Sequence, residues 1–238
     1  MAFKTDLFFS IKKDFLEPRY IHLNYISPEQ LDGFLSLGWF RIQQTIFTTS
    51  FLNFDGILYD AIWLRVCLHD FTADKKYKIL SAKNKKFRTE IRQALITPAH
   101  ENLFASYKNS ISFETASSLL SLLQGDSDFN VYNTFMINVY DGERLIGSGG
   151  FDLGSNSAAG IFSVYDPAYK KFSLGKYMIY EKMLYCKREN FTYFYPGYFV
   201  PGYPSFDYKI EIGKRALEYF DIEQGKWCSF STIKNGDF

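Results

Sequence analysis

Four consecutive residues in the second half of the sequence have the composition of an anion-binding helix start. Ser173, Leu174, Gly175 and Lys176 follow a strand-like segment and a loop, and they open a segment with the apolar spacing of a helix. The free N–H groups and the dipole at a helix N-terminus favour a phosphate group. The run therefore predicts a phosphate-binding site. An ordinary helix with a serine cap is the alternative that the residues alone leave open.

Other residues near this run could act on a bound substrate. Asp166 ends the preceding strand-like segment and could accept the proton of an amine or hold an ammonium group. Tyr165 and Tyr198 could stack on a nucleobase or donate hydrogen bonds, and Lys209 could neutralise a phosphate or bind a carboxylate. Each also has a structural interpretation. Asp166 could be a turn residue, the two tyrosines could pack in the core, and Lys209 could be a solvated lysine.

A second group of candidate residues lies in the first half and is basic. Between Lys75 and Arg92 the sequence holds eight Lys or Arg residues, with Tyr77 and Phe87 among them. This pattern suits contacts with a nucleic acid backbone and occasional base stacking, and a solvated charged segment is the alternative. The residues that we predict to bind nucleic acid are Lys83, Lys85, Lys86 and Arg88.

Arg65 is a charged residue inside the apolar run from Ala61 to Leu68. A charge on such a strand needs a partner, because an unpaired charge is costly to bury. The carboxylate of a substrate would suit it, since arginine can hold a carboxylate with two parallel hydrogen bonds. A structural ion pair is equally compatible with the sequence.

Composition limits the class of protein. A chain of 238 residues allows one large domain or two fused halves, and a net charge of +1 excludes a generally basic nucleic-acid coat protein. No apolar stretch approaches the ~18 residues of a membrane span, and the N-terminal run does not resemble a signal peptide. The scattered cysteines predict a reducing cytoplasm, no metal and no cofactor; they are Cys67, Cys186 and Cys228.

Helix and strand signals alternate along the chain without a low-complexity linker. In the first half, Ser27 and Gln30 form a potential capping box for a helix that ends at Gly38. Strands are expected at 41–52 and 57–68 with a turn at 53–56, and helices from Thr97 to about Tyr107 and from Ser112 to Gly125.

The second half predicts strands before and after one long helix. Strands are expected at 134–140, 144–153 and 158–166, then a helix from Ser173 to about Arg188, a strand at 192–199 and a short tail. Asp141-Gly142 marks a hairpin. This order predicts an α+β fold in which a crossover helix joins strands of a mixed sheet. We place the boundary between the two halves at 125/126.

Five short motifs in the second half carry a resemblance to a known family. They are Gly142–Gly147, Val164–Pro167, Ser173–Gly175, Tyr195–Tyr198 and Asp207–Lys209. Fainter matches in the first half are Gly38–Arg41, Leu64–Val66, the basic stretch around Lys86 and Ile96–Pro98. In order and spacing these motifs resemble the arginyl-tRNA–protein transferases, a family that includes bacterial leucyl-transferring relatives.

The resemblance implies an activity and a fold. Members move arginine or leucine from a charged tRNA to the α-amine of a protein N-terminus, here expected to be acidic. The implied fold is a GNAT-type acyltransferase unit in 126–238, after an α/β half in 1–125 that contacts tRNA and acceptor and resembles a divergent second GNAT-like unit.

Residue roles follow from the resemblance as expectations. Asp166, Tyr165, Tyr198 and Lys209 are expected to be catalytic. The residues expected to bind substrate are Ser173, Leu174, Gly175, Lys176, Arg65 and Arg41, and the partners are an aminoacyl-tRNA and an acceptor protein or peptide N-terminus.

Two departures from the family pattern keep alternatives open. The family's cysteine cluster is missing from Thr45–Asp60, so a bound metal or iron–sulfur cluster is not carried over, and the family's Arg-His pair is missing near Lys108-Asn109. A non-catalytic descendant that binds only tRNA or peptide would fit these losses. An acyl-CoA-dependent N-acyltransferase of the GNAT type is a further alternative, although the single glycine in Lys171–Tyr177 disfavours it.

Overall fold

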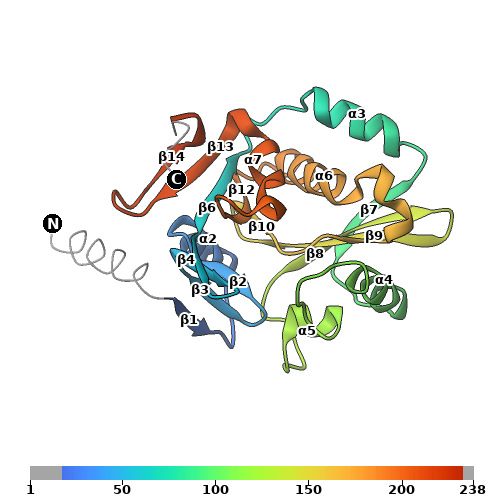
Figure 1. Ribbon diagram of the computed structural model, residues 1–238, viewed down its shortest axis with the longest axis horizontal. Coiled ribbons are helices and arrows are strands. Elements are labelled where there is room, and N and C mark those ends of the chain that lie inside the picture. The colour runs from blue at the N-terminus through green and yellow to red at the C-terminus, as the bar shows by residue number, and fades with distance from the viewer. Residues whose placement is uncertain (1–17, 233–238) are drawn as a thin grey trace.

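A mixed β-sheet with helices on both faces forms the centre of the fold in the computed structural model, which describes residues 18–232 (Figure 1). Strand β11 (Val164–Tyr165) pairs with β9 beside the main path. The order along the main path is β14 (Lys226–Ser229), β13 (Leu217–Asp221), β6 (Ile62–Cys67), β12 (Tyr193–Phe199), β10 (Ser157–Gly160), β9 (Arg144–Leu153), β8 (Thr134–Asp141) and β7 (Arg88–Gln93).

The two faces of β8 contact different helices. Ile137 and Val139 pack against α6 (Leu174–Arg188), whereas Met136 packs against α4 (Pro98–Lys108). Side chains of a strand alternate between its two faces, so β8 contributes apolar side chains to the contacts with the helices on both faces of the sheet.

Strands of both predicted halves share this one sheet. From the first half, β6 lies between β12 and β13, and β7 pairs with β8 at the edge. A division at 125/126 into a tRNA-contacting half and a transfer half therefore stays a prediction about function.

The predicted crossover is confirmed. Strands β10 and β12 are parallel, with Ser157 opposite Tyr193 and Ala159 opposite Tyr195, and α6 connects them. Helix α6 follows a 3-10 turn, η1 (Pro167–Phe172), and packs on β8 and β9 through Leu174 and Met178. The α+β fold with a mixed sheet agrees with the sequence-based expectation.

The sheet opens directly after this short parallel pairing. Beyond Gly160 the chain continues to β11, which pairs with β9, while β12 shifts register between Phe194 and Gly197 and continues along β6. Pro196 has no N–H to donate, and Gly197 adopts φ +90°, a conformation that favours glycine. The strands can therefore separate at Pro196 without leaving an unpaired N–H group at this residue.

The predicted strands of the first half are broken into shorter pieces. They are β2 (Phe40–Ile42), β3 (Thr45–Thr48), β4 (Phe51–Phe54), β5 (Ile57–Asp60) and β6, while β1 (Arg19–His22), β3 and β2 form a small antiparallel sheet. Strands β4 and β5 form the predicted hairpin, whose turn has positive φ at Asp55 (+52°) and Gly56 (+82°).

Local helix signals were mostly correct. Helix α2 (Pro28–Ser36) has the expected capping box, and α4 follows Thr97-Pro98. The predicted start at Ser112 was wrong: α5 (Leu119–Gln124) is capped by Ser118, and the Glu101 carboxylate accepts the N–H groups of Leu119 and Leu120. Basic residues form α3 (Lys75–Asn84), and the expected short tail contains α7 (Tyr208–Glu211), β13 and β14.

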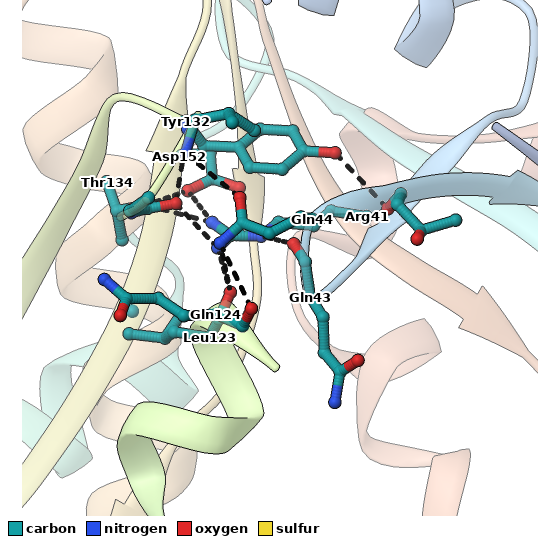
Figure 2. A network of polar contacts seen from close by, with 12 residues as sticks. Arg41, Gln43, Gln44, Leu123, Gln124, Tyr132, Thr134 and Asp152 are labelled. Carbon is teal, nitrogen blue, oxygen red and sulfur yellow. Dashed lines mark hydrogen bonds and ion pairs between the residues drawn. The ribbon is translucent and has the colours of Figure 1, made fainter. Parts of the chain in front are cut away.

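Arg41 joins the small sheet to the large one (Figure 2). Its Nη1 donates to Asp152 Oδ1 at 2.8 Å and to Thr134 Oγ1 at 3.0 Å, and its Nε donates to Gln43 O at 2.7 Å. Its Nη2 donates to the Leu123 carbonyl and to Asn130 Oδ1. All five guanidinium donors are therefore used inside the protein. The substrate-binding role expected of Arg41 would require breaking this network.

The Arg41–Asp152 pair gives a stability prediction. Replacing Arg41 with Met leaves the Asp152 carboxylate buried without its cation, and we expect a loss of about 3–5 kcal/mol in the free energy of unfolding. Arg88→Met is the matched control, because Arg88 is half exposed in its pair with Glu90 and such a pair contributes only about 0–1 kcal/mol. Urea unfolding measures the free energy of unfolding of both variants. Equal losses would contradict the conclusion that the buried network of Arg41 stabilises the fold.

Candidate functional site

Two neighbouring cavities lie where the sheet opens. The smaller, of about 120 Å³, is formed by residues from β6, the end of β10, β12, α6 and α7. The larger, of about 360 Å³, lies at the start of α6. The cavities share Ser163, Ile179 and Tyr208, so a ligand that spans both would pass these three residues.

The larger cavity collects four of the predicted site residues. Tyr165, Ser173, Gly175 and Lys176 all line it. The rings of Tyr165 and Tyr107 lie 5.4 Å apart between centroids, and both line the cavity. Aromatic rings in such a cavity can stack on a nucleobase.

The start of α6 departs from an ordinary serine cap. Ser173 has φ +54° and ψ +43°, and its side chain caps no backbone N–H group. Leu174 is buried in the core, so only its backbone could reach a ligand. Lys170 lines the same cavity, and Lys176 pairs with Glu211 at 3.1 Å. Since that pair is nearly half exposed, a phosphate could replace the carboxylate at little cost.

The smaller cavity has apolar walls and two lysines. No aspartate or glutamate lines it; its apolar side chains are Val66, Ile161, Phe162, Ile179, Met183, Phe194 and Ile212. The lysines are Lys182 from α6 and Lys209 from α7. The cavity therefore suits an apolar group, and a bound anion would be stabilised there.

Lys182 was missed by the sequence analysis. It is 1% exposed, and its Nζ donates to Phe162 O at 2.7 Å, Gly150 O at 3.0 Å and Ser163 Oγ at 3.2 Å. Burial lowers the pKa of Lys182 to about 7. A signal was present: Leu174, Met178, Lys182 and Cys186 are spaced by four, so the lysine continues an apolar helix face.

Lys209 contacts Tyr198, another residue of the family motifs. Its Nζ donates to Tyr198 O at 2.9 Å and lies 5.0 Å from the ring centroids of Tyr198 and Phe206. Burial lowers the pKa of Lys209 to about 7. Within residues 18–232 it forms no ion pair, which leaves its charge available to a ligand.

Asp166 and Arg65 lie outside both cavities. Asp166 accepts the Ala168 N–H at 2.9 Å and forms an ion pair with Arg144. Arg65 pairs with Glu218 at 2.6 Å. These contacts fit the structural alternatives for both residues, and their catalytic and substrate-binding roles stay untested predictions.

The basic stretch lies beside the start of α6. Asn84, the last residue of α3, donates to the carbonyl oxygen of Phe172 at 3.1 Å, and Lys86 Nζ lies 5.0 Å from the Phe172 ring centroid. Four exposed cations extend this basic region: Lys83, Lys85, Lys86 and Arg88. Of these four, Lys86 contacts Phe172, which lies just before the start of α6.

Comparison with known proteins decides the family. Residues 80–218 match the family described as "Arginine-tRNA-protein transferase, C terminus". The chain belongs to this family. It is therefore an enzyme that transfers an aminoacyl group from aminoacyl-tRNA to a protein, and this sets aside the acyl-CoA and non-catalytic alternatives.

Several relatives cover most of the chain. An aspartate/glutamate leucyltransferase of Leptospira interrogans is 30% identical over 193 residues, which are 77% of this chain and 72% of the relative. One from Helicobacter hepaticus is 28% identical and covers 85% and 87%. The arginyl-tRNA–protein transferase 1 of Saccharomyces cerevisiae is 30% identical over 96 residues, 40% of this chain and 18% of that protein.

Among solved structures, FemX aligns with a TM-score of 0.48 at 10% sequence identity, covering 77% of this chain and 66% of that chain. Within residues 18–232, the enzyme has no helix that is both long and apolar enough to cross a membrane.

Substitutions at Asp166 and Gly175 separate the structural and functional interpretations. Asp166→Asn keeps an oxygen for the Ala168 N–H, so we expect transfer within about threefold of wild type, whereas loss of a general base would cost ~10²-fold or more. A Cβ on Gly175 would lie 3.6 Å from the Tyr165 ring, an ordinary contact. The larger side chain of Gly175→Val would extend into the cavity where the phosphate is expected to approach the backbone. This variant should therefore weaken tRNA binding while the protein stays folded. A 10²-fold slower Asp166→Asn variant would restore the base assignment.

Proposed function

We propose that the enzyme transfers leucine from leucyl-tRNA to an acceptor protein whose N-terminal residue is aspartate or glutamate. The observation that carries this proposal is the smaller cavity, with its apolar walls, two lysines and lack of a carboxylate. Relatives that cover most of the chain are named aspartate/glutamate leucyltransferases, which supports the same choice.

The composition of the smaller cavity favours leucine over arginine as the transferred residue. A leucyl side chain would pack against Ile179, Met183 and Phe194. An arginyl guanidinium would be buried near Lys182 and Lys209, and no carboxylate of the protein lines the cavity to pair with it; a charge buried beside like charges is unfavourable.

The donor tRNA would enter through the larger cavity. Its terminal adenine can stack on Tyr165, and its phosphates can bind Lys176 and the free N–H groups at Leu174 and Gly175, since the Ser173 N–H already donates to Lys170 O. The aminoacyl ester would then lie near Ser163 and Tyr208, where the cavities meet. The RNA backbone would continue toward the basic residues beside α3.

The acceptor's acidic side chain would bind Lys209. This lysine has no ion-pair partner within residues 18–232, and it is held in place by Tyr198. A carboxylate at this position would restore charge balance in the cavity. Since aminoacyl-tRNA is made and used in the cytoplasm, we propose that the enzyme acts there.

The proposed donor and acceptor give a direct test. A charged tRNA pool is offered with peptides that differ only in an N-terminal Asp, Glu, Asn or Ala, and the transferred residue is identified by mass spectrometry. We expect leucine on the Asp and Glu peptides, with at least about tenfold lower efficiency on Asn and Ala, the usual scale for loss of one charge-assisted hydrogen bond. Transfer of arginine in preference to leucine would refute the proposed donor.

The pKa of Lys209 predicts how acceptor recognition depends on pH. Only protonated Lys209 can pair with a carboxylate, and its pKa is about 7. The KM of the Asp peptide, relative to that of the Asn peptide, should therefore rise as pH increases above 7, by up to about tenfold per unit. The ratio removes the titration of the α-amine, which both peptides share.

Two variants complete this test. Lys209→Arg keeps its charge through this pH range, so the KM ratio should become flat. Lys209→Met should remove the preference for Asp at every pH. A ratio that rises unchanged in Lys209→Arg would show that another group titrates.

A further inference from the structure

Ser163 lies at the junction of the two cavities and has a hydroxyl proton to donate. It lines both cavities, and its Oγ accepts a hydrogen bond from Lys182 Nζ at 3.2 Å. Within residues 18–232, no acceptor is found for the Ser163 hydroxyl proton. A serine hydroxyl that accepts one hydrogen bond still donates its own. The Ser163 hydroxyl can therefore donate to a ligand that spans the cavities.

Lys182 has no ion pair within residues 18–232, although it is a buried amine. Its other acceptors are the carbonyl oxygens of Gly150 and Phe162, so an ammonium group at this position uses all three protons. These acceptors come from the two segments that border the opened sheet, β9 and the chain between β10 and β11. A cation donating to the Ser163 oxygen makes the serine hydroxyl a stronger donor.

Two adjacent glycines make room for this arrangement. A Cβ on Gly149 would lie 2.7 Å from Lys182 Nζ and 3.0 Å from Phe162 O. A Cβ on Gly150 would lie 2.4 Å from Cε1 of the Phe162 ring. Distances of 2.7 Å and 2.4 Å are too short for a real Cβ atom, so the Lys182 ammonium group and the Phe162 ring can take these positions only beside glycine.

We propose that Ser163 is a catalytic residue that donates a hydrogen bond to the carbonyl oxygen of the aminoacyl ester as that oxygen becomes an oxyanion, and that Lys182 is a positioning residue that orients and polarises Ser163. This rests on the proposed function, because it assumes that the ester lies where the cavities meet.

The step balances without a covalent enzyme intermediate. The neutral α-amine of the acceptor attacks the ester carbonyl carbon, a C–N bond forms, and negative charge develops on the carbonyl oxygen. Collapse breaks the bond between that carbon and the ribose oxygen, which takes up the proton lost by the amine. Ser163 keeps its proton throughout and stabilises only the developing charge.

Single-turnover kinetics test the role of Ser163. Enzyme in excess over charged tRNA is mixed with a saturating Asp peptide, and tRNA affinity is measured separately. Ser163→Ala should slow transfer by about 10²-fold, the usual loss for one oxyanion donor, with tRNA affinity unchanged. Ser163→Thr, which keeps a hydroxyl, should retain most of the rate. Ser148→Ala is a matched control, since Ser148 is a buried serine that lines neither cavity and donates to Asn138.

A double-mutant cycle tests the role of Lys182. Lys182→Met should slow transfer strongly in the wild-type background and hardly at all in the Ser163→Ala background, because its effect acts through Ser163. Equal effects in both backgrounds would refute the positioning role. A wild-type transfer rate in Ser163→Ala would overturn the proposal itself, even if Lys182→Met fails to fold. A wild-type enzyme that transfers no residue from any charged tRNA would instead refute the proposed function.

Discussion

The separation of β10 from β12 is the constraint on which the site depends. The two strands pair over three residues; beyond Gly160 the chain continues to β11, which pairs with β9, while β12 stays paired with β6. A sheet that opens exposes carbonyl and N–H groups that need partners. Here Pro196 has no N–H to leave unpaired, and Lys182 occupies two carbonyl oxygens beside the opening. The cavity that results is bordered by a rigid sheet, a favourable support for a reacting ester.

The charge distribution of the site follows from this opening. Lys182 is held by backbone oxygens, and Lys209 by Tyr198, so neither lysine depends on a protein carboxylate. The reactants supply the missing negative charge, with phosphates on the donor, a carboxylate on the acceptor and an oxyanion in the transition state. The chemistry needs little more, because an aminoacyl ester is already activated and aminolysis requires mainly positioning and stabilisation of that oxyanion.

The sequence predicted what is local and missed what depends on partners far along the chain. The crossover helix and the strand after it were predicted correctly, since their apolar spacing and turn residues are local signals, but the single strand expected at 158–166 is divided into β10 and β11. Arg41 and Arg65 could not be assigned from sequence, because Asp152 and Glu218 lie 111 and 153 residues away. The helix start predicted at Ser112 was wrong because nothing in the sequence indicated that Glu101 would stabilise a helix start at Ser118.

Candidate residues show the same limit. Gly175 and Tyr165 were recognised because they lie in motifs, and the structure brings them into one cavity. Lys182 lies in no motif and is defined by three acceptors from two other segments. Its position on an apolar helix face was visible in the sequence, but whether such a lysine faces a cavity or solvent is decided by tertiary packing alone.

The central claim is that one aminoacyl-adenosine spans both cavities, with its side chain in the smaller one. A crystal structure with 3′-leucylamido-3′-deoxyadenosine, in which a stable amide replaces the ester, tests it most directly. We predict the adenine at Tyr165, the carbonyl oxygen within hydrogen-bond distance of Ser163 Oγ, and the leucyl side chain among Ile179, Met183 and Phe194. Binding of the analogue with its leucyl group outside the smaller cavity would contradict the account.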